Sequence, residues 1–139
     1  MVDIVERNEV VQFKDGDFVL DVNVSPQEET VWLSANQMAK LFDKDEKTIR
    51  KHINNIFKDD ELSIENNTQK MRVVGVKQLV AFYSLDVIIS VGYRVKSKNG
   101  ILFRKWANNI LREYLLKGYV VNDRHFQDIE YVTKMLDQY

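Results

Sequence analysis

The sequence predicts an α+β fold in which a small antiparallel sheet is followed by several helices. Three patterns support this class. Residues 1–33 alternate apolar and polar side chains as strands do, residues 34–57 carry apolar side chains at helical spacing, and residues 101–117 form a long amphipathic pattern. The chain has 139 residues, of which 45% are hydrophobic, so it can bury the core of one domain.

A hairpin and a short third strand are expected first. Apolar residues alternate over 18–24, and residues 10–13 supply the partner strand. Between them lies the pair Asp15-Gly16, which is a strong turn signal. Pro26 ends the second strand, and residues 30–33 form the third.

Two short helices joined by a three-residue turn are expected over residues 34–57. Ser34 can cap the first helix, and Gln37 completes a capping box. The turn Asp43-Lys44-Asp45 ends that helix, and Asp45 caps the next one. One face of the second helix would be buried through Ile49, Ile53, Ile56 and Phe57. This is the pattern of a helix-turn-helix, whose second helix can enter the major groove of DNA.

The opposite face of this second helix carries the candidate DNA-reading residues. They are Lys47, Thr48, Arg50, Lys51 and Asn54, which we expect to face bases and phosphates. The alternative is an ordinary helical hairpin with a solvated charged face. The small Ala39, the short turn and the isoleucine spacing favour the DNA interpretation. Asp43 stands where such turns often have Gly, and Asp tolerates the left-handed backbone better than most residues.

A polar loop is expected over residues 58–69, with at most one helical turn, followed by strands over residues 70–83 that bend at Gly75. A hairpin in this place could make the helix-turn-helix a winged one. Its cations Lys70, Arg72 and Lys77 could reach phosphates, or they are ordinary surface cations on a core hairpin.

More helices are expected toward the C-terminus. Residues 84–95 could form a buried strand, but Ser84 as a cap and the apolar spacing favour a helix. Residues 96–100 should form a loop, and the helix over 101–117 should end at Gly118. Its expected apolar face consists of Leu102, Phe103, Trp106, Ala107, Ile110, Tyr114 and Leu115.

The formal net charge of -1 hides a segregation of charge along the chain. Residues 1–30 are strongly acidic, whereas residues 31–58 and 90–118 are basic. A polyanion would therefore meet the two basic segments rather than the protein as a whole. The second segment supplies a predicted phosphate-directed patch of Arg94, Lys96, Lys98, Arg104, Lys105 and Arg112.

Sites for chemistry are sparse, so we expect no enzyme, no cofactor and no metal. The chain has no cysteine, only two histidines and no glycine-rich phosphate loop. The N-terminus lacks a signal pattern and no apolar run is long enough to span a bilayer. We therefore expect a cytoplasmic protein that does not bind membranes.

From Val31 onward the sequence resembles the RhuM-like virulence proteins of bacteria. The resemblance is carried by residues 30–34, 37–42, 48–57, 85–97, 103–107 and 111–119, the third of which reads Thr-Ile-Arg-Lys-His-Ile-Asn-Asn-Ile-Phe. The helix from Phe103 is also similar to the Phe-x-x-Trp helix of phage antirepressor and BRO-type domains. The turn Asp43-Lys44-Asp45 differs from the Gly-x-Ser turn common in the family.

The resemblance implies a DNA-binding-like N-terminal domain, which longer relatives extend, sometimes with a Fic region. Here His125 is followed by Phe126 but not by the Gly-Asn of the Fic motif, so that catalytic motif is not in this chain. We divide the chain into a DNA-binding-like domain, 1–122, and a C-terminal helix, 123–139, which serves as an interface or leads into a further region.

The sequence therefore predicts a protein that binds double-stranded DNA and regulates transcription in a phage-, virulence- or toxin-related locus. We expect a homodimer, held together by the terminal helix through Phe126, Ile129, Val132, Thr133 and Leu136. The alternative is that this apolar stripe packs back on Trp106 and Tyr114 within one monomer. Two other interpretations remain: a protein-interaction module with a protein partner, or the non-catalytic N-terminal half of a longer Fic-like protein.

Overall fold

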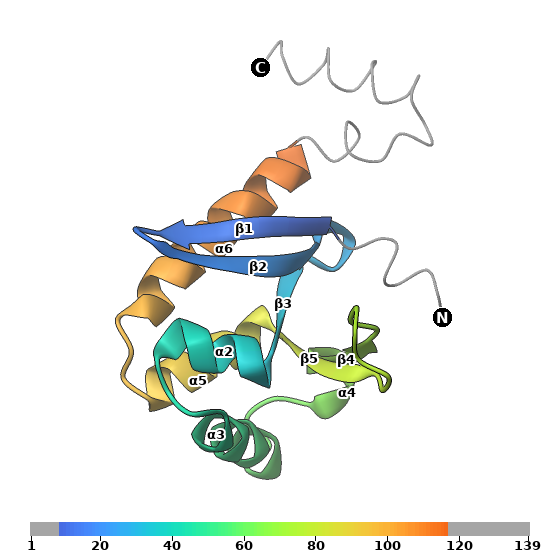
Figure 1. Cartoon of the computed structure of the whole chain (residues 1–139), viewed down its shortest axis with the longest axis vertical. Helices are drawn as coiled ribbons and strands as arrows, with labels where there is room; N and C mark the ends of the chain where they lie inside the picture. The colour runs from blue at the N-terminus through green and yellow to red at the C-terminus, as the bar shows by residue number, and fades with distance from the viewer. Residues whose placement is uncertain (1–8, 117–139) are drawn as a thin grey trace.

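Five antiparallel strands and five α-helices make up residues 9–116, the part of the chain that the computed structural model describes (Figure 1). The strands are β1 (Glu9–Asp15), β2 (Phe18–Ser25), β3 (Thr30–Ser34), β4 (Thr68–Met71) and β5 (Val80–Ser84). They form one sheet in the order β1-β2-β3-β5-β4, so β3 joins the N-terminal ribbon to the later hairpin. The predicted α+β class is confirmed.

The N-terminal hairpin forms where the alternating pattern placed it. β1 and β2 pair from Glu9 opposite Val24 to Asp15 opposite Phe18, and Gly16 takes a positive φ of 61° in the turn. The side chains of Leu20, Val22 and Val24 are buried on the inner face of β2. Pro26 begins a 3-10 helix, η1 (Pro26–Glu28), which ends β2 as expected.

The two predicted helices and their turn are also present. α2 (Ala35–Phe42) begins with the expected capping box, in which Gln37 N–H donates to Ser34 Oγ at 3.2 Å and Ser34 N–H donates to Gln37 Oε1 at 2.9 Å. Asp43 follows in the left-handed conformation with φ 55°. α3 (Glu46–Lys58) is capped by Asp45, whose side chain accepts a hydrogen bond from Thr48 N–H.

Replacing Asp43 by Gly should stabilise the fold, because an L side chain in the left-handed region costs about 1–2 kcal/mol. Glycine loses more backbone entropy on folding, so we expect a net gain of about 0.5–1 kcal/mol in the free energy of unfolding. Urea unfolding of Asp43→Gly measures this gain, with Asp43→Val as the opposite control, expected to be destabilised. A loss of stability in Asp43→Gly would mean that the carboxylate contributes more than the backbone strain costs.

The β4–β5 hairpin is shorter than the sequence predicted. Residues 58–69 contain one helical turn, α4 (Ile64–Asn67), as expected. The bend lies at Gly75, with φ 83°, as predicted, but residues 72–79 are not in strands. The β-branched residues there have neither a partner strand nor a core surface to cover, because the hairpin pairs only Thr68–Met71 with residues 80–83.

The last two described helices are α5 (Leu85–Arg94) and α6 (Asn99–Leu116). Ser84 caps α5, so the helix chosen over a buried strand is confirmed. α6 begins two residues earlier than predicted, because Ser97 Oγ accepts from Asn99 N–H and Asn99 Nδ2 donates to Leu41 O at 2.8 Å. The apolar face of α6 is narrower than predicted, since Leu102 and Leu115 are exposed. Gly118 and the predicted helix over 123–139 lie outside the described residues.

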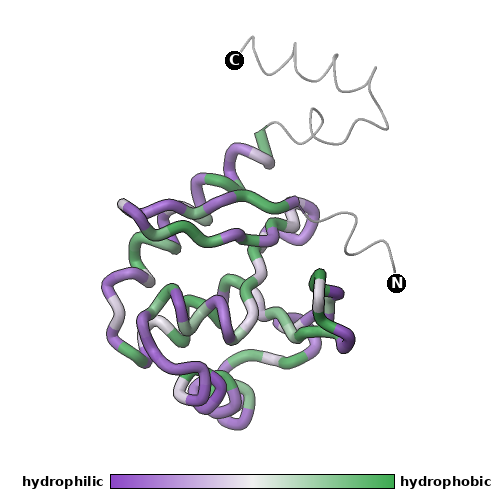
Figure 2. Tube along the Cα trace, viewed as in Figure 1, coloured by the Kyte–Doolittle hydropathy of each residue, from purple (hydrophilic) through white to green (hydrophobic). Residues whose placement is uncertain are grey.

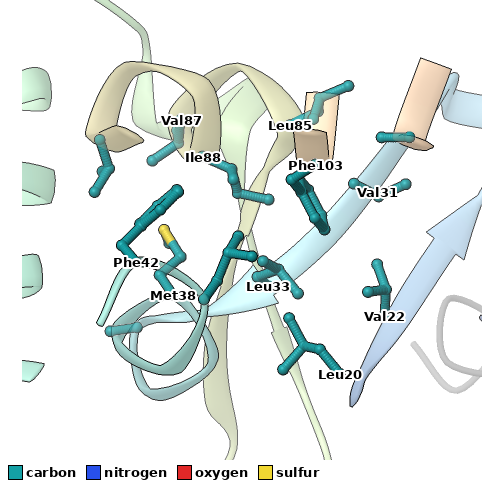
Figure 3. Close-up of a cluster of buried hydrophobic side chains, with 14 of the residues drawn as sticks. Leu20, Val22, Val31, Leu33, Met38, Phe42, Leu85, Val87, Ile88 and Phe103 are labelled. Atoms are coloured by element: carbon teal, nitrogen blue, oxygen red, sulfur yellow. The ribbon is translucent and has the colours of Figure 1, made fainter. Parts of the chain in front are cut away.

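The core lies between the inner face of the sheet and the helices (Figure 3). Leu20, Val22, Val31 and Leu33 from the strands meet Met38, Phe42, Ile88 and Phe103 from the helices. β3 runs directly into α2, and β5 runs directly into α5, with Ser34 and Ser84 as the respective caps. The α2–α3 pair is therefore attached to the central strand of the sheet without an intervening loop.

Candidate nucleic-acid interface

α3 is held against the fold by its isoleucines. Ile49, Ile53 and Ile56 are completely or almost completely buried, and α3 packs against α2 and α5. Four of the predicted DNA-reading side chains are exposed on the rest of the helix: Lys47, Arg50, Lys51 and Asn54. Figure 1 shows α3 at the end of the molecule away from β1, and Figure 2 shows its purple, hydrophilic outer turns.

The fifth predicted residue, Thr48, forms hydrogen bonds with the helix cap Asp45. Its hydroxyl donates to Asp45 Oδ1 at 2.5 Å, and its N–H donates to Asp45 Oδ2 at 3.2 Å. These bonds lower the pKa of Asp45 and keep its carboxylate charged at the positive end of α3. Thr48 thus stabilises the start of α3, with its hydroxyl proton already donated.

Arg50 is oriented by a network between α2 and α3. Its Nε donates to Glu46 Oε2 at 2.9 Å, its NH2 group also binds this oxygen, and Asn36 Nδ2 donates to Glu46 Oε1 at 3.2 Å. The Arg50 hydrogen bond is the main cause of the lowered pKa of Glu46. The sequence showed Glu46 as a helix-end charge but did not reveal that it connects the two helices.

The root of the β4–β5 hairpin lies beside α3. The rings of Phe57 and Tyr83 are 6.3 Å apart between centroids. Burial raises the pKa of the Tyr83 hydroxyl, and the charge of Arg50 opposes that rise. The side chain of Asn67 accepts from Ser84 Oγ at 2.6 Å and donates to Ser63 O at 2.8 Å. The ring contact places the end of β5 beside α3, and the Asn67 hydrogen bonds hold the end of α4 against the end of β5.

Arg94, predicted to belong to the second phosphate patch, is engaged by carboxylates. Its NH2 group lies 2.9 Å from Glu61 Oε1 and 3.8 Å from Asp59 Oδ2. Ser90 Oγ also donates to Glu61, and the Arg94 hydrogen bond is the main cause of the lowered pKa of Glu61. Arg94 therefore joins α5 to the end of α3, which sequence spacing did not reveal.

The other members of that patch are divided between two places. Lys96, Lys98 and Arg104 line a hollow of about 500 Å³ between α5 and α6, together with Tyr93 and Ile101, whose exposed fractions are 85% and 54%. Lys105 and Arg112 are exposed along α6, which runs behind the β1–β2 ribbon and away from α3 in Figure 1. The C-terminal turns of α6 are thus on a different part of the molecule from α3.

The environment of His52 should make the free energy of unfolding depend on pH. Partial burial, with the nearby charges of Arg94 and Lys51, lowers the pKa of His52 in the folded state. The unfolded chain therefore binds more protons below the ordinary pKa of about 6.5, so stability should fall as the pH drops through that value and level off below the folded pKa. Urea unfolding of wild type and His52→Gln between pH 7.5 and about 5 tests this window. A difference between the two proteins that stays constant with pH would contradict the assignment.

Within residues 9–116 no group of three or more His, Cys, Asp or Glu side chains could hold a metal ion. No described helix is both long and apolar enough to cross a membrane.

Comparison with known families matches residues 43–139 to the virulence protein RhuM family. Searches of curated proteins and of solved structures found no match.

Proposed function

The chain belongs to the virulence protein RhuM family, and we propose that it binds double-stranded DNA by placing the exposed face of α3 in the major groove. Membership of this family associates the chain with virulence. The proposed activity comes from the chemistry of α3, and we propose that it serves transcriptional control in a phage-, virulence- or toxin-related locus.

The observation that carries the proposal is the exposed face of α3, which presents Lys47, Arg50, Lys51 and Asn54 while its isoleucines are buried. Arginine and asparagine are the side chains that read guanine and adenine edges, and lysines bind phosphates. α2 and the turn hold α3 at its N-terminal end, where recognition helices meet base edges.

Selection of bound sequences from random duplex DNA, followed by titration of the preferred duplex at several salt concentrations, tests the proposal. We expect a defined preferred site and an affinity that falls with salt at about the 0.9 power for each phosphate contact. A homodimer should select two half-sites about one helical turn apart. Absence of any duplex binding at about 50 mM salt, where such contacts are strong, would refute the proposal.

Single substitutions then identify the reading surface. Arg50→Ala and Asn54→Ala should each relax the preference at one base pair, at a cost of about 1–3 kcal/mol. Arg112→Ala on α6 should leave the preferred sequence unchanged. If Arg112→Ala changed the preference while Arg50→Ala did not, α3 would not be the reading helix.

A further inference from the structure

The tip of the β4–β5 hairpin is an ordered turn that presents an apolar side chain at its apex. Val76 N–H donates to Val73 O at 3.0 Å, and Gly75 has φ 83°, as in a type II β-turn with Val74 at its second position. Val74 is fully exposed, and Val73, Val76 and Leu79 are also exposed. Figure 2 shows green, hydrophobic stretches in this loop beside purple ones.

Clustered exposed aliphatic side chains usually mark a contact surface. The strands of this hairpin contribute Met71, Val80 and Phe82 to the second apolar cluster, around Trp32. The valines of the tip, Val73, Val74 and Val76, belong to neither apolar cluster of the described residues. The tip therefore has the properties of a surface that a partner covers.

The charge of this hairpin identifies the class of partner. Residues 66–85 contain Lys70, Arg72 and Lys77 and no Asp or Glu. Lys70 and Arg72 precede the turn and Lys77 follows it, so cations stand on both legs of the hairpin with the apolar apex between them. A projection that carries cations and no carboxylates is complementary in charge to a polyanion rather than to a typical protein surface.

We propose that this hairpin tip enters the minor groove of the duplex that α3 binds, with Val74 against the base edges. Arg72 and Lys77 then contact phosphates on the two sides of the groove. This inference rests on the proposed function of α3. Proteins that bind the minor groove combine cations with apolar wedges placed against base steps, and this groove is only about 6 Å wide, which suits a single apex residue.

The position of the hairpin supports the idea that a single duplex contacts both α3 and the hairpin tip. Its root lies beside α3 through the contact between Phe57 of α3 and Tyr83 of β5. Along B-DNA a minor groove lies next to each major groove, so a projection beside a helix in the major groove meets the neighbouring minor groove.

The test uses the full chain, its preferred duplex and two hairpin variants. Arg72→Gln with Lys77→Gln should lower affinity about ten-fold at low salt and reduce the salt slope by about two, because two phosphate contacts are lost. Val74→Ser should lower affinity about five-fold and leave the salt slope unchanged, because it removes only apolar contact. Hydroxyl-radical footprinting should show that protection flanking the α3 site decreases in both variants.

Val10→Ser is the matched control, because Val10 is an exposed valine on β1. It should bind as the unmodified chain does. If α3 substitutions abolish binding while both hairpin variants keep the affinity, the salt slope and the footprint, the inference is wrong and the proposed function stands. If the unmodified chain binds no duplex, both are wrong. If Val74→Ser changes only self-association measured without DNA, the tip is a protein contact and the inference is overturned.

Discussion

Reversing the charge of Lys47 and Lys51 together is expected to lower the affinity for the preferred duplex by at least about 100-fold near 0.1 M salt. In the proposed complex the two substitutions to Glu would remove two phosphate contacts and place two negative charges beside the DNA backbone, well within the Debye length of about 10 Å. Both side chains are exposed on α3, so the fold should remain intact. Fluorescence anisotropy with labelled duplex measures the affinity, and thermal unfolding checks the fold.

The matched control is the double reversal Lys105→Glu with Arg112→Glu, which changes the net charge by the same amount on α6. We expect the affinity for the preferred duplex to fall by less than about ten-fold, without a change in the preferred sequence. These two side chains on α6 would attract the duplex over a distance or contact its phosphates, and neither interaction reads the bases. A larger loss for the α6 pair than for the α3 pair would move the principal interface to α6.

Replacing Gly92 by Val is expected to lower the free energy of unfolding by about 2–3 kcal/mol, the upper range for overpacking of a core. A Cβ at this position would lie 3.1 Å from Cε1 and Cζ of Phe42, whose ring is buried. Phe42 is the last residue of α2, so a displaced ring would also disturb the turn that positions α3. Urea unfolding measures the stability, and duplex binding should weaken in the same variant.

Gly100→Ala is the control, because a Cβ there meets Gly92 Cα at 3.6 Å and Phe42 Cε1 at 3.7 Å, which are ordinary contacts. Gly100 lies in α6, so Ala should be neutral or stabilising by up to about 1 kcal/mol. If Gly92→Val were as stable as the unmodified chain, the packing of α5 against Phe42 of α2 would not require a glycine at position 92.

Sequence reasoning succeeded where short-range chemistry determines the structure. The caps at Ser34, Asp45 and Ser84 each need only residues three positions away, and all three are present. The left-handed backbone at Asp43 and the bend at Gly75 likewise follow from local conformational preference. The helical spacing of the isoleucines in α3 likewise placed Lys47, Arg50, Lys51 and Asn54 on its exposed side.

Contacts between distant segments could not be read from the sequence. The insertion of β3 between β2 and β5 depends on pairing across about fifty residues of chain. Arg94 belongs to a basic segment in the sequence, and nothing in the spacing of the chain indicates its ion pair with Glu61, which lies 33 residues earlier. The exposed valines near Gly75 were assigned to strands, because β propensity does not reveal whether a partner strand is present.

The direct passage of β3 into α2 has a consequence for the thermodynamics of recognition. A helix attached to a central strand without a loop has little freedom to reorient, and the Asn36–Glu46–Arg50 network also restrains the side chain that would read a base. A surface fixed in advance loses little conformational entropy on association. If Arg50 reads a base as proposed, it would have to exchange the Glu46 carboxylate for a base edge. A mismatched base that offers no equivalent acceptor would then leave Arg50 bound to Glu46. Discrimination between DNA sites would then depend on the competition between Glu46 and the base edge for Arg50, as well as on the contacts with the duplex.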